Sequence, residues 1–271
     1  MNRCHPAMID SRDRGLAYGD GLFETLRVAA DGRIPLWTWH QQRLVAGART
    51  LGIPAPDAAQ LEQALAQARV QLQGPGLIKL MLTRGVGGRG YLPPADAQPA
   101  LLWQTGQLPV WSEQDRRDGI VMGLCSQPLQ RDPFAGLKHL NRLAQVQART
   151  EVARQGWQEG LLLSSRREPL EATAMNLFAR FDSGWWTPDL SAANAGVAGV
   201  MRQWLIEDLV LRGESVQSDL LPLSQLRHAR GLFLVNSVVG LLPVRKLAQW
   251  QWPVPDAVLA LQARVDSLFE A

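Results

Sequence analysis

Along most of this chain, segments with the period of a β-strand alternate with segments of helical period, and a polar stretch interrupts the alternation near the middle. The apolar runs of strand length in the first half are 21–29, 76–83 and 100–105. The stretches of helical spacing are 40–51 and 57–73, the second with Asp57 as its expected N-cap. Asp31-Gly32 is a hairpin signal, which predicts that 21–29 pairs with a short strand over 33–36.

The same alternation resumes after a polar linker, predicted over 107–118. The strands expected there are 120–125, 160–164, 176–181 and 231–235. The helices expected there are 140–155, 200–212, 223–228 and 256–269. Strand and helix alternating in both halves predicts two α/β or α+β domains, 1–106 and 119–271. A cleft between two such domains is a common place for a small-molecule cofactor.

Charge and composition exclude several classes of protein. The net charge is only +3 over 271 residues, and acidic and basic residues are interleaved, which speaks against a nucleic-acid or membrane-surface partner. Two distant cysteines and four histidines, none at ligand spacing, predict neither a disulfide framework nor a metal site. The first residues lack the apolar core of a signal peptide, and no apolar run approaches the ~18 residues of a membrane span. We therefore expect a soluble, cytoplasmic protein.

The stretch 85–90 matches the glycine pattern G-x-G-x-x-G directly after an apolar strand. Dinucleotide binding requires a helix to open at the third glycine, so that its N-terminus faces the pyrophosphate. Tyr91-Leu92-Pro93-Pro94 follows instead and prevents that helix, and no acidic residue stands about 20 positions on. The pattern favours a loop lining a cleft, with Arg84 and Arg89 able to meet an anionic substrate.

Only three lysines are present, so an amine nucleophile has few candidates. Lys138 stands among Gly, Leu and Phe, where desolvation would lower the pKa of its amine and favour attack on a carbonyl carbon. The alternative is a surface lysine at the start of a helix. Lys79 lies mid-strand, as a snorkelling or cleft-lining residue would, and Lys246 stands in a polar turn with no activating feature.

Two further signals are weak when taken singly. The small-residue stretch 196–199 opens an amphipathic helix, and the N–H groups at such a start attract anions, although many helices follow a glycine. Glu171 precedes a strand among small residues, as a site carboxylate or an ordinary loop glutamate would.

The order of these signals along the chain is typical of one family. The segments concerned are 13–25, 40–44, 84–91, 138–143, 171–178, 199–202, 236–237 and 243–244. Together they make the sequence similar to the class IV aminotransferases, the fold-type IV pyridoxal-phosphate enzymes. The resemblance implies a two-domain α/β (α+β) fold with pyridoxal 5′-phosphate in the cleft between an N-terminal domain and a cofactor-binding C-terminal domain. It also implies a homodimer.

The resemblance assigns roles to individual residues. Lys138 would be the catalytic lysine that binds the cofactor covalently, and Glu171 would keep the pyridine nitrogen protonated. The residues implied to hold the phosphate are Arg43, the amides of Val200 and Met201, and Ser237 with the Val238 amide. An arginine and a helix N-terminus suit a dianion.

Within the family, the segment Lys138 to Leu143 and the loop 84–91 most resemble a lyase that eliminates pyruvate from 4-amino-4-deoxychorismate to give 4-aminobenzoate. Arg27, Arg84 or Arg89 would hold a substrate carboxylate. A D-amino-acid or branched-chain aminotransferase is the alternative, and the presence of Glu24 favours it. A silent binding protein and a nicotinamide-dependent enzyme are the remaining hypotheses. The sequence departs from the family before Asp13 and at 163–168, both away from the lysine.

Overall fold

The computed structural model describes residues 3–4 and 9–270, with the side chains of residues 3 and 4 left aside. The chain divides into two compact units. The first comprises Met1–Pro109, Leu137–Asn141 and Glu270–Ala271, and the second comprises Val110–Gly136 and Arg142–Phe269. The short segment that carries Lys138 thus groups with the N-terminal unit, although it follows the predicted linker in sequence.

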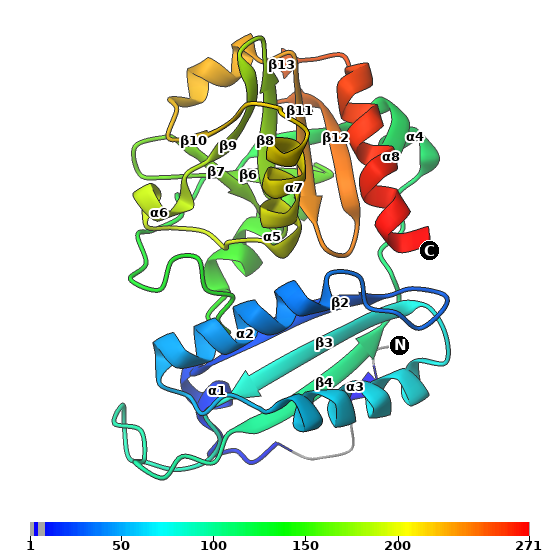
Figure 1. Ribbon diagram of the computed structural model, residues 1–271. Coiled ribbons are helices and arrows are strands. Elements are labelled where there is room, and N and C mark those ends of the chain that lie inside the picture. Colours follow the sequence, from blue (N-terminus) through cyan, green and yellow to red (C-terminus); the bar gives the residue numbers. More distant parts are fainter. Residues whose placement is uncertain (1–2, 5–8, 271) are drawn as a thin grey trace. The chain divides into compact units, whose positions relative to one another are not determined.

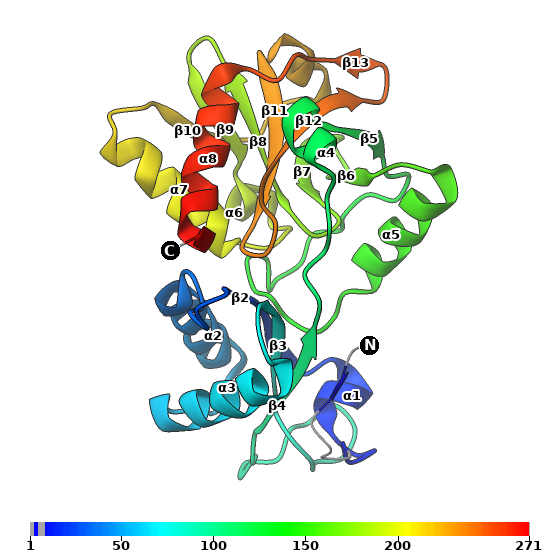
Figure 2. The same ribbon diagram turned by 90° about the vertical axis from the view of Figure 1, so that its right-hand side faces the viewer.

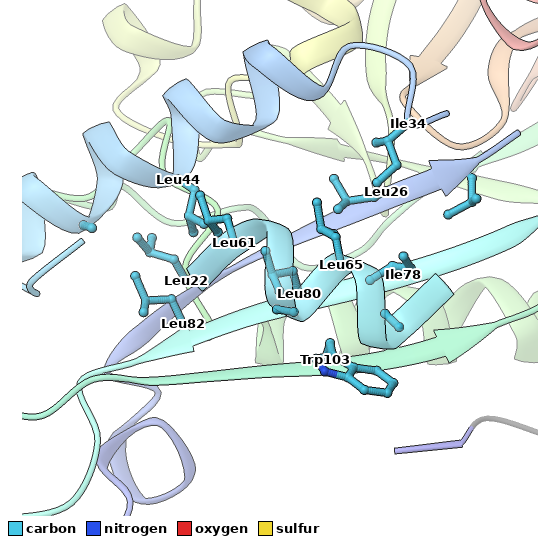
Figure 3. Packing of buried hydrophobic residues seen from close by; sticks show 14 of the residues in the cluster. Leu22, Leu26, Ile34, Leu44, Leu61, Leu65, Ile78, Leu80, Leu82 and Trp103 are labelled. Atoms are coloured by element: carbon cyan, nitrogen blue, oxygen red, sulfur yellow. The ribbon is translucent and has the colours of Figure 1, made fainter. Parts of the chain in front are cut away.

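The first unit is an antiparallel sheet with its two longer helices on one face (Figure 1). Its strands are β1 (Arg3–Cys4), β2 (Gly21–Val28), β3 (Gly76–Thr83) and β4 (Ala100–Gly106), in the order β1-β4-β3-β2. Its helices are α1 (Arg14–Tyr18), α2 (Trp37–Leu51) and α3 (Ala58–Leu72). The core lies between the sheet and the pair α2 and α3, where Leu22, Leu26 and Ile78 pack against Leu44 and Leu65 (Figure 3).

Strict alternation along β2 and β3 divides the sheet into two faces. Even-numbered residues of β2, such as Leu22 and Leu26, are buried in the core, whereas Phe23, Thr25 and Arg27 are half-buried on the opposite face. This is the period-2 pattern that a strand of apolar and polar residues produces when one face packs against helices.

Local signals predicted some elements of this unit well and one of them wrongly. β3 has the predicted bounds, and Asp57 caps α3 in a reciprocal capping box with Gln60. The strand predicted over 33–36 is wrong. After β2 the Ala29 amide donates to the Arg33 carbonyl at 2.9 Å, which closes a turn, and α2 begins at Trp37.

The second unit is built on a nine-stranded mixed sheet. Its strands are β5 (Ile120–Leu124), β6 (Glu159–Leu163), β7 (Pro169–Ala172), β8 (Asn176–Phe181), β9 (Gly184–Pro188), β10 (Val216–Asp219), β11 (Gly231–Asn236), β12 (Gly240–Leu247) and β13 (Trp250–Gln251). Its helices are α4 (Glu113–Asp118), α5 (Leu143–Gln155), α6 (Leu190–Ala193), α7 (Val200–Leu211), α8 (Asp256–Glu270) and the 3-10 helix η1 (Leu223–His228).

Two strand pairings decide how this sheet is organised. β8 pairs with β11 on one side, and Glu171 of β7 pairs with Asn176 of β8, so that six strands form a closed ring in the order β8-β11-β12-β5-β6-β7. Glu171 therefore stands at the point where the ring closes. In the same unit, α7 and α8 lie side by side (Figure 2), and the Arg264 guanidinium of α8 contacts the Asp208 carboxylate of α7.

Part of the stretch predicted as linker is helical. Ser112 accepts a hydrogen bond from the Asp115 amide at 3.0 Å and caps α4, which occupies Glu113–Asp118. No helix among residues 3–4 and 9–270 is long and apolar enough to span a membrane. Within the same ranges, no group of three or more His, Cys, Asp or Glu side chains is arranged to hold a metal ion.

Candidate functional site

Lys138 lies on an extended segment that adds to the free edge of β2. The Phe23 amide donates to the Lys138 carbonyl, and the Leu140 amide donates to the Gly21 carbonyl, both at 2.9 Å. α5 begins only at Leu143, so Lys138 is not at a helix start as one interpretation of the sequence had it. Its half-buried side chain lies with Phe23 on the face opposite α2 and α3, with Nζ 4.5 Å from the centre of the Phe23 ring.

Arg43 belongs to a buried network with Glu24 and His40. His40 and Arg43 are three residues apart on α2, which places both on the side facing β2. Nε of Arg43 lies 2.8 Å from Oε1 of Glu24, and Nδ1 of His40 lies 2.7 Å from Oε2. Glu24 and His40 are each 1% exposed. Neither was assigned a site role from the sequence, although the His-x-x-Arg spacing opposite a strand glutamate was the available signal.

Burial and the neighbouring charges together shift the pKa of Glu24 and that of His40. Burial by itself would raise the pKa of Glu24, but the charge of Arg43 and the hydrogen bonds from His40 and Arg43 lower it to about 2. Burial lowers the pKa of His40, against the opposing effect of Glu24. At neutral pH the carboxyl of Glu24 is therefore charged and the imidazole of His40 is uncharged.

Arg84 has the contacts of a structural arginine. Its guanidinium is buried beside Asp20, with Nε 2.7 Å from Oδ2 and Nη2 3.0 Å from Oδ1. It also donates to the carbonyls of Leu51 and Gly52, each at 2.8 Å. Because these contacts tie β3 to the end of α2, the expectation that Arg84 reaches a substrate carboxylate is not supported by its placement.

The other two candidate arginines differ in setting. Arg27 is half-buried on β2, on the same face as Phe23. Arg89 is exposed in the glycine loop, and no helix follows that loop, as its sequence predicts. The loop instead surrounds Arg14, whose guanidinium donates to the carbonyls of Gly90 at 3.1 Å and Tyr91 at 2.9 Å.

In the second unit, Glu171 is held from two directions. Its side chain is buried on β7, and Oε2 accepts the Val197 amide at 2.8 Å, while Nε2 of Gln145 lies 3.5 Å from Oε1. A Cβ added at Gly196 would lie 3.1 Å from Oε2 and 2.9 Å from the Leu190 side chain. The stretch of small residues before α7 is thus required for close approach to this carboxylate.

The first turn of α7 begins without a side-chain cap. Gly199 precedes the helix, and no side chain caps its first amides, those of Val200 and Met201. A Cβ at Gly199 would lie 1.9 Å from Oδ1 of Asn176, whose Nδ2 donates to the Val197 carbonyl at 2.9 Å. A helix start that only glycine fits, with donors left for another molecule, is the geometry of an anion site.

The turn between β11 and β12 carries the last two predicted residues. Oδ1 of Asn236 accepts the amides of Val238 at 3.0 Å and Val239 at 2.7 Å. The Val238 amide, expected to bind a phosphate, is thus directed to Asn236 in this structure. Ser237 lies half-buried in the same turn.

The match to a family model defines the class of protein. The model of the family described as amino-transferase class IV matches residues 21–247, and the chain belongs to that family. Among curated relatives, it is 34% identical to an aminodeoxychorismate lyase of Vibrio harveyi over 237 residues, covering 86% of this chain and 84% of that protein. It is also similar, at 26% identity, to a D-alanine aminotransferase of Listeria monocytogenes, covering 88% of this chain and 82% of that protein.

The sequence identity to one solved structure is higher than the identity to either of these relatives. The crystal structure of 4-amino-4-deoxychorismate lyase from Pseudomonas aeruginosa superposes with a TM-score of 0.91, at 39% sequence identity and with 98% of both chains covered.

Proposed function

We propose that this protein is a pyridoxal-phosphate-dependent lyase that converts 4-amino-4-deoxychorismate into 4-aminobenzoate and pyruvate, a step of folate biosynthesis. The observation that carries the proposal is the similarity to lyases of this name over nearly the full chain, at 34% and 39% identity. The family and the lysine segment 138–143 support the same activity, and the cofactor is pyridoxal 5′-phosphate.

The residues of each unit fit parts of this cofactor. In the first unit, Lys138 offers an amine beside an aromatic ring, and Arg43 offers a guanidinium oriented by Glu24. In the second, the uncapped amides of Val200 and Met201 suit a phosphate, and Ser237 adds a hydroxyl. The Val238 amide would have to leave Asn236 to join them. Buried Glu171 suits a protonated ring nitrogen, because two charges of opposite sign stabilise one another at a desolvated position.

When bound, pyridoxal phosphate withdraws electrons from the substrate carbon that carries the amine. The amine of Lys138 then acts as a general base and removes the proton on that carbon. The bond between the ring and the enolpyruvyl oxygen breaks, that group takes up a proton and leaves as pyruvate, and the ring becomes aromatic as 4-aminobenzoate. Glu24 and His40 act on this chemistry through Arg43, whose orientation they set.

Two broader properties belong to the same proposal. We infer a homodimer, as the family resemblance implies, and a cytoplasmic location, which fits the buried thiol of Cys125. Burial raises the pKa of Cys125 to about 12, so this thiol is uncharged and unreactive at neutral pH.

A D-amino-acid or branched-chain aminotransferase is the second candidate, favoured by the similarity to D-alanine aminotransferase. Pyruvate and 4-aminobenzoate would be measured after the purified holoenzyme is mixed with 4-amino-4-deoxychorismate and no keto acid. The lyase forms both products in equal amounts. If the products require a keto acid, or if D-alanine with 2-oxoglutarate turns over faster, the aminotransferase is the correct assignment.

A further inference from the structure

A positive side chain occupies the first turn of α7, where helices ordinarily favour a negative one. Arg202 is the third residue of this helix, and the first turn contains no acidic residue. The N-terminal end of a helix is already the positive end of its dipole, so a cation placed there is repelled and an anion is attracted. Because Cα–Cβ bonds tilt towards the start of a helix, the side chain of Arg202 begins at that positive end.

The guanidinium of Arg202 is held in place by uncharged oxygens. Its Nε donates to Oγ1 of Thr187 at 3.1 Å, and its Nη2 donates to the Pro188 carbonyl at 2.9 Å and to Oγ of Ser218 at 3.2 Å. Thr187 is fully buried, and its own hydroxyl donates to the Leu177 carbonyl at 2.8 Å, so Thr187 serves Arg202 as an acceptor. These bonds fix the first turn of α7 against β9 and β10 without neutralising the charge.

No carboxylate among residues 3–4 and 9–270 forms an ion pair with Arg202. Asp189 acts on Arg202 electrostatically, but its carboxylate accepts the amides of Ser191 and Ala192 at 2.9 and 3.0 Å and so caps α6. The side chain of Arg202 is half-buried, and burial lowers its pKa against the opposing effect of Asp189. A guanidinium stays charged at neutral pH nonetheless, so an anion from outside the chain would stabilise it.

We propose that Arg202 strengthens the binding of the cofactor phosphate through its charge, while its hydrogen bonds remain with β9 and β10. The inference rests on the proposed function, because that function places the phosphate at the amides of Val200 and Met201. A Cβ added at Gly199 would lie 3.6 Å from Cβ of Arg202 and 1.9 Å from Oδ1 of Asn176. The side chain of Arg202 therefore starts beside the helix end, and a dianion there relieves the repulsion between the guanidinium and the helix dipole.

The phosphate ligands proposed for the second unit explain why such a charge is needed. They are the amides of Val200 and Met201 and the hydroxyl of Ser237, none of which carries a net charge. A dianion held by neutral donors alone is costly at a partly desolvated position, because its charge has lost water without gaining a counterion. Arg202 contributes a full positive charge from the same helix turn that supplies two of these donors.

The test compares two ligands that differ only in the phosphate. Pyridoxamine 5′-phosphate and pyridoxamine carry no aldehyde, so neither forms a covalent bond with a lysine. Their dissociation constants would be measured by titration calorimetry on the full chain freed of cofactor, for the unchanged protein, Arg202→Gln and Arg202→Lys. We expect Arg202→Gln to lower the preference for the phosphorylated ligand about tenfold, and Arg202→Lys to keep most of it, because lysine retains the charge.

The matched control is Arg212→Gln, which removes the same charge just beyond the opposite end of α7. Arg212 pairs with Asp208, with Nε 3.1 Å from Oδ2, and its loss should leave the preference unchanged. An arginine that only ties α7 to β9 and β10 would lower the unfolding temperature in both Arg202 variants without changing the ratio of the two affinities.

Three outcomes would overturn the proposal: an unchanged protein with no preference for the phosphorylated ligand, an Arg202→Gln variant that keeps the preference, or an Arg202→Lys variant that loses as much of it as Arg202→Gln. The last outcome would assign the effect to the hydrogen bonds rather than to the charge. If Arg202→Gln lowers the preference but the unchanged holoenzyme forms no pyruvate from 4-amino-4-deoxychorismate, the proposed function fails while the role of Arg202 stands.

Discussion

Arg43 donates two hydrogen bonds to Glu24, with Nε 2.8 Å from Oε1 and Nη2 2.5 Å from Oε2. A bidentate pair fixes the plane of a guanidinium as well as its position. Since Glu24 is buried and is also contacted by His40, this carboxylate sets the direction of Arg43 from the face of β2 that packs against α2. The orientation of a proposed phosphate ligand is thus decided by two residues that would not touch the cofactor.

Replacing Glu24 by Gln should reduce stability in a way that depends on pH. The folded carboxyl has its pKa lowered from 4.5 to about 2, so it stabilises the protein fully above pH 4.5, and this stabilisation is lost as the pH falls towards 2. The shift corresponds to about 3 kcal/mol at neutral pH. Urea unfolding of the holoenzyme and of Glu24→Gln would measure the difference.

The difference between the two proteins should be large at pH 7 and smaller at pH 3.5. A difference that stays constant between these values would show that the charge of Glu24 is not the cause. Asp31→Asn serves as the control, because that exposed carboxylate contacts only its own turn.

Arg84→Lys should weaken the fold rather than substrate binding. A lysine ammonium cannot reproduce a fork that meets both oxygens of Asp20 and two carbonyls, so we expect a loss of about 2 kcal/mol. The KM for 4-amino-4-deoxychorismate should change less than twofold. A tenfold rise in KM with unchanged stability would show instead that Arg84 binds the substrate. Arg89→Lys, in the exposed loop, should leave stability unchanged.

Lys138→Ala should abolish both turnover and the visible absorbance of the bound cofactor. The amine is the proposed point of covalent attachment and the proposed base, so no other residue replaces both roles. Borohydride treatment of the unchanged protein, followed by peptide mass spectrometry, should place the label on Lys138. Lys246→Arg should change neither property, and a label on Lys79 or Lys246 would contradict the assignment.

Gly199→Ala should weaken cofactor binding about tenfold. The added Cβ would overlap Oδ1 of Asn176 and push the first turn of α7 away from its position. The dissociation constant of pyridoxal phosphate would be measured by absorbance titration. Leu211→Ala, at the exposed far end of the same helix, is the matched control. Equal affinities in the two variants would argue against a phosphate at this helix start.

Elements with a strong local signal could be predicted from the sequence. The bounds of β3 follow from an apolar run, and the start of α3 follows from the side chain of Asp57. β12 was not predicted, because Pro243 interrupts its pattern and its strand character depends on pairing with β11 and β5. The opposite error occurred at 33–36, where a hairpin signal predicted a strand but a turn and the start of α2 follow.

The order of short segments along the chain was enough to identify the family and to single out Lys138. Each segment can be recognised from its own residues, without knowledge of its neighbours in the folded protein. Only the tertiary structure decided that Glu24 orients Arg43, that Arg84 is engaged by Asp20, and that Lys79 shares the Phe23 ring with Lys138. These relationships join residues 19 to 115 positions apart in sequence. Long-range pairing sets them, and local propensity carries no information about it.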